Sequence, residues 1–390
     1  MKKINFKKFI RKIHLWLGLT SGLIVFIIAI TGCIYVFSDE FTYSFRKNDM
    51  YVQSQEKPLD LNILWESTQQ QLGPTFQLSW VNVYNNPTKS YIFYAYKSNE
   101  NAITYFENLE YYKSIYVNPY TGKILNIYNE ELDFFNIVKM LHWSLLLKTE
   151  YGQPIVGYST IIFVLMLISG LILWLPKNKK SRKQRLTFQW KNTTKWKRKN
   201  YDFHNILGFY VGSVAIIIAL TGLVWAFSWF QAIVYVVGSG TTTPPDFSRA
   251  TSTYTVSPKE TALKLALETS KTKYLTANGF RITQAKDSTD IINVYIQQYD
   301  GLYYVNHSLQ FDQYSGKLLK ERNHKNKNFG EKIINANYDI HVGAILGMPG
   351  KIIAFIASLI CASLPLTGFL IWIGRKRKNK IDYKKTLVKN

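Results

Sequence analysis

The sequence predicts a membrane protein with four transmembrane helices, built as two parallel pseudo-repeats that each carry an α+β extracytoplasmic region. Three observations lead to this fold class. Four apolar stretches have the length of a membrane span. The basic residues gather in three segments that all fall on one side of a four-span topology. A motif of one histidine and two glycines recurs in the second half of the chain with unchanged spacing.

The four apolar stretches are each close to the ~20 residues that cross a bilayer core of ~30 Å. They predict transmembrane helices over 15–37, 155–175, 204–227 and 350–373. The remaining segments are predicted as a tail over 1–14, an extracytoplasmic region over 38–150, a basic loop over 176–203, a second extracytoplasmic region over 228–348, and a tail over 374–390.

The net charge of +23 is typical of nucleic-acid-binding proteins, but its distribution excludes that partner. Residues 2–12, 177–200 and 375–390 hold six, eleven and eight Lys or Arg with a single acidic residue among them, so the rest of the chain is close to neutral. Basic segments on one side of the lipid bilayer indicate the cytoplasmic side. We therefore predict a multi-pass protein of the inner (cytoplasmic) membrane with both termini and the 176–203 loop in the cytoplasm.

The first extracytoplasmic region is predicted to contain a helix, two strands and a hairpin. The pattern over 59–72 is that of a short amphipathic helix, and 76–84 and 90–97 alternate as strands do. Gly122 lies in the turn of a hairpin. Residues 134–147 are apolar but too short to span, so they predict a helix lying at the membrane interface.

The second extracytoplasmic region repeats this plan. Ser257-Pro258-Lys259-Glu260 has the pattern of a capping box with proline at the first helical position, which predicts a helix that runs to about Thr272. Residues 291–298 and 302–311 read as strands, and Gly316 lies in a hairpin turn like that of Gly122.

The repeated motif opens the first and third spans. It reads His14-x-x-x-Gly18-x-x-x-Gly22 in one half and His204-x-x-x-Gly208-x-x-x-Gly212 in the other. Residues four apart share one helix face, so each histidine has a glycine-lined strip beside it. Such a strip suits a flat, bulky metal cofactor. The alternative is that Gly-x-x-x-Gly serves helix packing, as it often does in membranes.

Two further histidines occupy corresponding positions before the second and fourth spans. His142 precedes Gly170 by 28 residues, and His341 precedes Gly368 by 27. Repeat symmetry would bring His14 and His204 together at the cytoplasmic side and His142 and His341 at the outer side. Pairing within each half is disfavoured because a bilayer core of ~30 Å would separate the two histidines.

Two axial imidazoles are what a six-coordinate haem requires. The sequence therefore predicts two bis-histidine haem b groups, with His14 and His204 as iron ligands of one and His142 and His341 of the other. Gly18, Gly22, Gly208 and Gly212 would flank the cytoplasmic haem. Zinc is a competing metal, although it prefers four ligands, and duplicated interfacial histidines without a metal are the remaining alternative.

Other residues with possible metal chemistry are predicted to play no part. His307 and His324 have no counterpart in the other half and are predicted to be solvated surface residues. Cys33 and Cys361 lie within apolar stretches and form no C-x-x-C-H motif, which excludes covalently attached haem. There is no nucleotide-binding motif, so the electrons must come from a separate donor, either a quinol or a cytoplasmic reductase.

These motifs resemble those of the PepSY-associated transmembrane family, which includes iron-regulated inner-membrane proteins and di-haem ferric-siderophore reductases. The resemblance covers nearly the whole chain. It rests on the two His-x-x-x-Gly motifs, Thr31-Gly32, Thr221-Gly222, Leu141-His142-Trp143, Asp339-Ile340-His341, and the hairpins with Thr121-Gly122-Lys123 and Ser315-Gly316-Lys317.

The resemblance implies a membrane oxidoreductase that reduces an extracytoplasmic ferric-siderophore and releases Fe(II), with PepSY-like folds in both outer regions. The alternative is a non-enzymatic PepSY protein that binds or regulates an extracytoplasmic partner. No catalytic residue is identified. Aromatic residues on the predicted strands could dock the substrate, but strand packing explains them equally well; they are Tyr111, Tyr112, Tyr303 and Tyr304.

Overall fold

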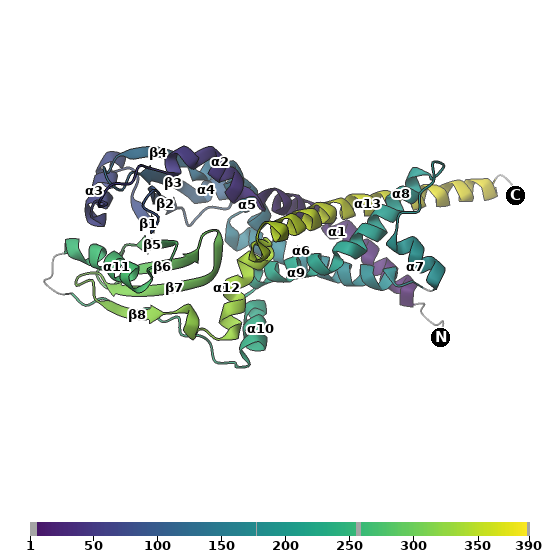
Figure 1. Ribbon diagram of the computed structural model, residues 1–390. Helices are drawn as coiled ribbons and strands as arrows, with labels where there is room; N and C mark the ends of the chain where they lie inside the picture. The colour runs from purple at the N-terminus through teal and green to yellow at the C-terminus, as the bar shows by residue number, and fades with distance from the viewer. Residues whose placement is uncertain (1–5, 177, 255–258, 388–390) are drawn as a thin grey trace. The chain divides into compact units, whose positions relative to one another are not determined.

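The computed structural model describes residues 6–176, 178–254 and 259–387, and the chain divides into two compact units (Figure 1). The membrane unit comprises Met1–Val36, Val138–Ser228 and His341–Asn390. The sheet unit comprises Phe37–Ile137 and Trp229–Ile340. Each unit therefore draws on both halves of the sequence.

Four helices in the described part of the chain are long and apolar enough to cross a membrane. These are Phe6–Tyr35, Thr149–Trp174, Trp196–Ala226 and Ala344–Lys376. They include α1 (Phe6–Tyr35), α6 (Thr149–Trp174), α9 (Gly208–Ala226) and α13 (Gly347–Leu387). At the N-terminal end of α1 and the C-terminal end of α13 the helix continues beyond the apolar stretch into Lys- and Arg-rich sequence, because these residues are good helix formers. The chain is thus a multi-pass membrane protein.

The four spans form a bundle in which α1 contacts both α6 and α13, and α9 contacts the same two helices. Consequently α1 and α9 lie on one diagonal of the bundle. The four glycines of the repeated motif line these contacts. A Cβ added to them would lie 3.4–3.5 Å from a side chain of α6 or α13; the contacts are Gly18–Met166, Gly22–Pro365, Gly208–Leu364 and Gly212–Leu171. The structure thus describes a helix-packing role for them, and their place beside a cofactor stays a prediction.

The sheet unit is built on one antiparallel sheet with the strand order β4-β3-β2-β1-β5-β6-β7-β8. The strands are β1 (Leu78–Tyr84), β2 (Tyr91–Ser98), β3 (Leu109–Val117), β4 (Ile124–Asn129), β5 (Gly279–Thr283), β6 (Ile291–Tyr299), β7 (Leu302–Asp312) and β8 (Leu318–Arg322). The pairing of β1 with β5, in which Val81 lies opposite Ile282, joins the two regions into one sheet. The sequence predicted the hairpins on both sides but not this junction.

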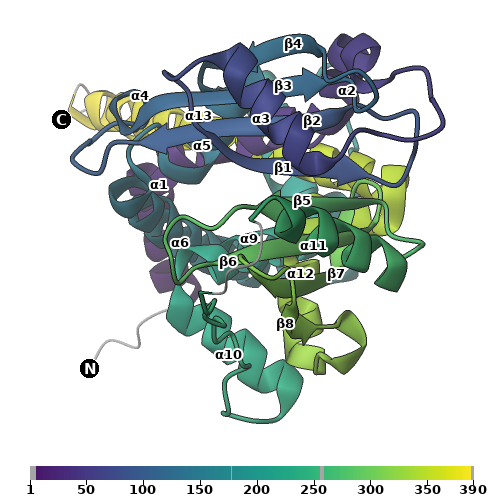
Figure 2. The ribbon, with the colours of Figure 1, turned by 90° about the vertical axis from the view of Figure 1, so that its left-hand side faces the viewer.

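One face of the sheet is covered by α3 (Leu61–Leu72) and α11 (Lys259–Lys273), which Figure 2 shows in front of the strands. Strand residues alternate between the two faces, so every second one enters this core. Val81, Phe93 and Ile282 are fully buried there together with Leu64 of α3 and Ala266 of α11. The first two residues of the predicted capping box, Ser257 and Pro258, lie outside the described residues.

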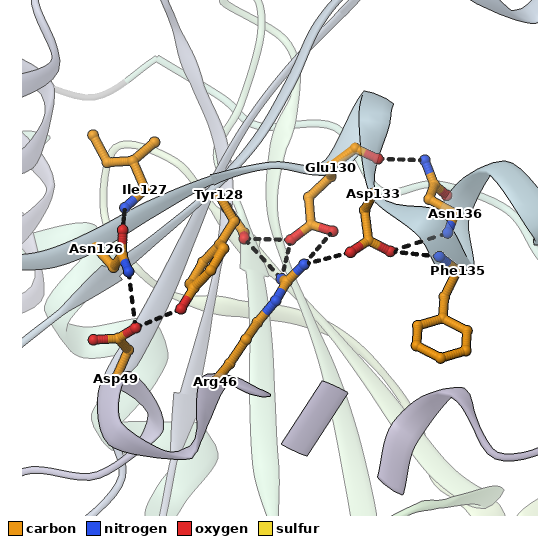
Figure 3. Close-up of polar contacts among 10 residues, drawn as sticks. Arg46, Asp49, Asn126, Ile127, Tyr128, Glu130, Asp133, Phe135 and Asn136 are labelled. Carbon is orange, nitrogen blue, oxygen red and sulfur yellow. Dashed lines mark hydrogen bonds and ion pairs between the residues drawn. The ribbon is translucent and has the colours of Figure 1, made fainter. Parts of the chain in front are cut away.

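Shorter helices complete the two units. They are α2 (Ser38–Met50), α4 (Tyr105–Asn108), α5 (Phe134–Ser144), α7 (Lys179–Leu186), α8 (Trp196–Asp202), α10 (Ser228–Ser239) and α12 (Phe329–His341). The predicted interfacial helix corresponds to α5. Asp133 caps its start by accepting the N–H groups of Phe135 and Asn136 at 2.9 and 3.1 Å. Arg46, buried in α2, forms ion pairs with Asp133 and Glu130 and fixes this cap (Figure 3).

Candidate functional site

Four histidines meet as two pairs within the membrane unit. The ring centroids of His14 and His204 are 6.3 Å apart, with an interplanar angle of 83°. Those of His142 and His341 are 6.0 Å apart, at 68°. We call the first the span pair, because spanning helices carry both residues, and the second the short-helix pair, because its residues lie near the ends of α5 and α12. All four histidines are intermediate between buried and exposed.

In the span pair, each ring is held by a hydroxyl from a neighbouring span. The Nδ1 atom of His14 lies 2.9 Å from the Ser169 Oγ of α6, and that of His204 lies 2.9 Å from the Thr367 Oγ1 of α13. Both hydroxyls donate their single proton to carbonyls of their own helices. They must therefore accept from Nδ1–H, which leaves the Nε2 of each imidazole with its lone pair.

In the short-helix pair, Nδ1 also carries the proton, and here backbone carbonyls show it. His142 Nδ1 lies 2.8 Å from the Ile28 carbonyl oxygen of α1, and His341 Nδ1 lies 3.1 Å from that of Ile218 in α9. A carbonyl can only accept, so Nδ1 carries the proton in both rings. Burial lowers the pKa of both histidines, so both imidazoles are neutral near pH 7.

Two threonines add a hydroxyl contact to the short-helix pair. Thr31 Oγ1 lies 3.3 Å from His142 Nδ1, and Thr221 Oγ1 lies 2.9 Å from His341 Nδ1. Each threonine also donates to carbonyls of its own helix, as Ser169 and Thr367 do. All four histidines thus use Nδ1 for support and present Nε2.

Each supporting hydroxyl residue is followed directly by a glycine that lies against the imidazole edge. A Cβ added to these glycines would lie 3.4, 3.2, 2.9 and 3.6 Å from the ring Cε1; the contacts are Gly170–His14, Gly368–His204, Gly32–His142 and Gly222–His341. We call Ser169-Gly170, Thr367-Gly368, Thr31-Gly32 and Thr221-Gly222 the hydroxyl–glycine pairs. The hydroxyl fixes the tautomer, and the glycine lets the ring approach the helix.

The geometry of both pairs fits two imidazoles that share one metal ion. A metal–nitrogen bond is ~2 Å, and the ring centroid lies ~1 Å further on, so two imidazoles on opposite sides of one metal place their centroids about 6 Å apart. Both measured separations agree with this value. No group of three or more His, Cys, Asp or Glu converges in the described residues. Two neutral imidazoles without a third protein ligand match the axial set of a haem better than a zinc site.

His307 and His324 show that proximity alone does not make such a pair. Their ring centroids are 6.5 Å apart. However, His307 Nδ1 accepts the backbone N–H of His324 at 3.1 Å, so in the neutral ring Nε2 carries the proton and has no lone pair for a metal. The prediction that both are solvated surface residues is wrong for His307, which is 5% exposed. The segment after β8 lies against it, and the ring of Tyr274 contacts its ring at a centroid distance of 4.3 Å.

The two pairs differ in their surroundings. His204 lies in a π-helical turn, Phe203–Leu207, whereas His14 lies in a regular α-helix. Such turns occur often at functional sites. At the short-helix pair, the indole of Trp225 is 5.3 Å from His341 and 6.1 Å from Trp143. The short-helix pair is therefore bordered by tryptophan on one side.

The structure brings the four predicted histidines together in the predicted combinations but places the predicted glycines at helix contacts. The sequence did not identify Ser169 and Thr367. A searchable signal existed, because a Ser-Gly or Thr-Gly dipeptide occurs within each of the four apolar stretches. Among the predicted docking tyrosines, Tyr111 belongs to the buried core of the sheet unit. The backbone N–H groups of Tyr303 and Tyr304 bind the buried carboxylate of Asp339.

The family described as PepSY-associated TM region matches residues 11–375. This match covers both units and all four histidines of the two pairs. No curated protein matches the chain.

Proposed function

We propose that this chain, which belongs to the family of PepSY-associated TM proteins, is a transmembrane haem-containing oxidoreductase. In this proposal it passes electrons from the cytoplasmic side or the quinol pool to an extracytoplasmic ferric-siderophore. The observation that carries the proposal is the geometry of four histidines in two pairs, each with its Nδ1 proton donated to a spanning helix and its Nε2 presented.

Two haem b groups would be held by these residues, one by His14 and His204 and the other by His142 and His341. Haem iron in such a site supplies reversible one-electron chemistry. The chain's own part is to keep each imidazole neutral and oriented. Nδ1 support by a hydroxyl or carbonyl is the usual way in which proteins fix the orientation and basicity of a ligating histidine.

The direction of transfer follows from the proposed topology. The basic segments favour a cytoplasmic location for the termini and the 176–203 loop, and an outer location for the sheet unit. The span pair then lies at the cytoplasmic side, because His14 and His204 follow basic segments directly. The recurrence of the helix, strand, histidine and hydroxyl–glycine pattern supports two parallel pseudo-repeats, which would relate the members of each pair by a twofold axis along the membrane normal.

The proposed acceptor suits one-electron delivery at the outer side. Siderophores hold Fe(III) through hard oxygen donors and hold Fe(II) much less tightly, so one electron added to the bound iron releases it for uptake. The chain need only hold the complex near the short-helix pair. Outer-sphere electron transfer requires no covalent bond between the chain and the substrate.

A visible absorption spectrum tests the proposal. Protein purified from haem-replete cells should be red, with a single Soret band and a sharp α-band on reduction, and with two haems per chain by pyridine haemochrome assay. A colourless folded protein would refute the haem proposal. That outcome would favour the second candidate function, a non-enzymatic PepSY protein that binds or regulates an outer partner, for which the large sheet unit is the supporting feature.

The topology is tested separately with reporter fusions at Lys57 and Lys271 in the sheet unit. Alkaline phosphatase activity at both positions is expected if the sheet unit lies outside the cell. Activity of a cytoplasmic reporter at either position would contradict the proposed orientation and, with it, the direction of electron transfer.

A further inference from the structure

The loop between the second and third spans forms a basic surface next to the span pair. Residues 177–200 hold eleven Lys or Arg and no acidic residue. Four of these side chains are exposed on or beside α8, and we call them the basic collar: Lys191, Lys195, Lys197 and Arg198.

The first part of this loop is held against the end of α6. Arg185 donates to the carbonyl oxygen of Leu173 at 3.0 Å and also to that of Trp174, so it caps the last turn of the helix. In return, Trp174 Nε1 donates to the Arg185 carbonyl at 3.2 Å. The Trp174 indole stacks on Phe209 of α9 with centroids 3.6 Å apart. The loop is thus a folded part of the membrane unit.

The second part is organised around Asp202, which is 4% exposed. Its carboxylate accepts Trp190 Nε1–H at 3.0 Å and Arg198 Nε–H at 2.9 Å. Trp190 also contacts the rings of Phe188 and Phe203, at 4.8 and 5.1 Å. This small aromatic and ionic core fixes α8 and thereby the positions of the collar lysines.

A hydrogen bond links α8 to the support of His204. Asn200, also 4% exposed, donates Nδ2–H to the Thr367 carbonyl oxygen at 3.0 Å. The Oγ1 of the same threonine accepts the Nδ1–H of His204 at 2.9 Å. Lys197 precedes His204 by seven residues, which corresponds to ~10 Å along a helix. The collar therefore lies within about two turns of a predicted haem ligand.

We propose that the basic collar is the docking surface for an acidic, soluble electron-carrier protein that delivers electrons to the span pair. This inference rests on the proposed function and names its donor. One electron would leave the carrier's cofactor and be accepted by the haem that His14 and His204 would hold, and no covalent bond would be made or broken. Opposite charge speeds such encounters and orients the partners, while a rigid surface keeps the distance between the two centres short.

A lipid headgroup is the other anionic occupant, and the loop fits it less well. Helices that lie in the membrane interface need an apolar face. The described helix α7 reads KKSRKQRL and has one apolar residue, Leu186. In α8, Trp196 is 65% exposed among the collar lysines. One exposed tryptophan surrounded by charge is typical of a protein interface, where an aromatic centre has a polar rim.

Binding to photoreduced or oxidised flavodoxin, an acidic one-electron carrier, tests the surface without relying on haem. The full chain in zwitterionic nanodiscs is compared with a collar variant, Lys191→Glu with Lys195→Glu and Lys197→Glu. A control carries the same charge change on exposed lysines of the sheet unit, Lys123→Glu with Lys286→Glu and Lys317→Glu. Surface plasmon resonance at low salt should show binding at least ~10-fold weaker for the collar variant and unchanged for the control.

Stopped-flow reduction of the haem by photoreduced flavodoxin provides the second measurement. The bimolecular rate should fall by about tenfold between low and high salt for the chain and the control, and be slow and salt-insensitive for the collar variant. Reduction by the neutral quinol duroquinol should be equal in all three. Unchanged flavodoxin binding and rate in the collar variant would overturn the inference. So would a collar effect that appears only with anionic lipid, which would assign the surface to headgroups.

The two proposals fail in distinguishable ways. A chain without a Soret band would refute the haem proposal, whatever flavodoxin binding shows. The other outcome is a chain that contains two haems and is reduced by duroquinol, but whose reactions with flavodoxin do not depend on collar charge. That outcome would leave the haem proposal intact and refute the docking surface.

Discussion

The span pair and the short-helix pair present the same imidazole nitrogen, but they are held by opposite arrangements of helices. In the span pair, α1 and the π-helical turn before α9 carry the histidines, and α6 and α13 supply the supporting hydroxyls. In the short-helix pair, α1 and α9 supply the support, and the histidines come from α5 and α12. The first and third spans therefore each carry a histidine at one end and support another histidine at the other end.

The hydrogen bonds that support each histidine and the contact that pairs it with a second histidine involve different parts of the chain. Every supporting hydrogen bond joins residues of the same half of the chain, such as His14 to Ser169 and His341 to Thr221. Every pair joins residues of different halves. A half can thus orient its own histidines, but two halves are needed to complete either site. Duplication of a two-span unit would yield both sites at once.

Removing a histidine gives the largest expected effect. His14→Ala and His204→Ala should each abolish binding of the same haem and leave one haem per chain, with the spectrum of the other unchanged. His142→Ala and His341→Ala should abolish the second haem instead. Haemochrome stoichiometry and low-temperature α-band spectra measure this directly.

The double variants check the pairing. His14→Ala combined with His204→Ala should still retain one haem, because both residues serve one site. Loss of both haems from a folded double variant would contradict pairing across halves. Complete retention of the second haem in His14→Ala with His142→Ala would contradict it as well, because that result is expected only if these two residues share one iron.

Removing the supporting hydroxyls should affect the span pair more than the short-helix pair. Ser169→Ala and Thr367→Val delete the only side-chain acceptors that bond His14 and His204 in the described structure. Outer-sphere changes of this kind typically weaken metal binding by 10–100-fold. Thr31→Val and Thr221→Val should cost only a few-fold, because the carbonyls of Ile28 and Ile218 still accept Nδ1–H.

Titration of apoprotein with haem measures these four affinities in one assay. A serine at position 367 is the conservative control, because Thr367→Ser keeps the acceptor and should bind haem as the unaltered chain does. Equal losses at both pairs would show that the backbone carbonyls add no support and would remove this distinction between the pairs.

Gly32 and Gly222, which lie against the two rings of the short-helix pair, should respond differently to substitution by alanine. A Cβ at Gly32 would lie 2.9 Å from His142 Cε1, which is too close, whereas a Cβ at Gly222 would lie 3.6 Å from His341 Cε1, an ordinary contact. Gly32→Ala should therefore displace His142 and broaden or shift the α-band of that haem. Gly222→Ala should leave the spectrum unchanged, and an equal response of the two variants would contradict this geometry.

Much of the architecture was predictable because its determinants are local in sequence. Span positions follow from apolar length, and α3, α11 and the hairpins follow from periodicity and turn residues. The family identified from the motifs is confirmed by the match over 11–375. The β1–β5 pairing could not be predicted in the same way. It joins Val81 to Ile282, residues 201 positions apart, and no turn between them specifies the register.

For the site, the sequence indicated which histidines matter but not what holds them. Repetition singled out His14, His204, His142 and His341, because a repeated rare residue stands out against apolar sequence. Ser169 and Thr367 do not stand out, since hydroxyls in a span often bond only to their own helix. The glycines after His14 and His204 were assigned to a cofactor because spacing shows which face they share, but not what lies opposite that face.

The smallest expected effect concerns the connections that follow the short-helix pair. After α5, Leu145 and Leu146 adopt left-handed backbone angles, φ 56° and 59°. After α12, the chain uses glycine where φ is positive: Gly343 is left-handed, with φ 79° and ψ −1°, and Gly347 has φ 65° and ψ −151°, a region essentially restricted to glycine. A left-handed residue with a side chain costs roughly 1–2 kcal/mol, and glycine loses roughly 0.5–1 kcal/mol through backbone entropy.

Leu146→Gly should therefore raise the stability of the folded chain by no more than about 1 kcal/mol, since relief of strain exceeds the entropy cost by a small margin. The reverse change, Gly347→Leu, is the control, because φ 65° with ψ −151° at this position is a conformation that residues other than glycine rarely adopt. It should lower stability by more than Leu146→Gly raises it. Thermal unfolding in detergent, followed by tryptophan fluorescence, compares the midpoints. A lower midpoint for Leu146→Gly would show that the leucine side chain contributes more through packing than its backbone conformation costs. The strain after α5 would then be offset locally by the packing of that side chain.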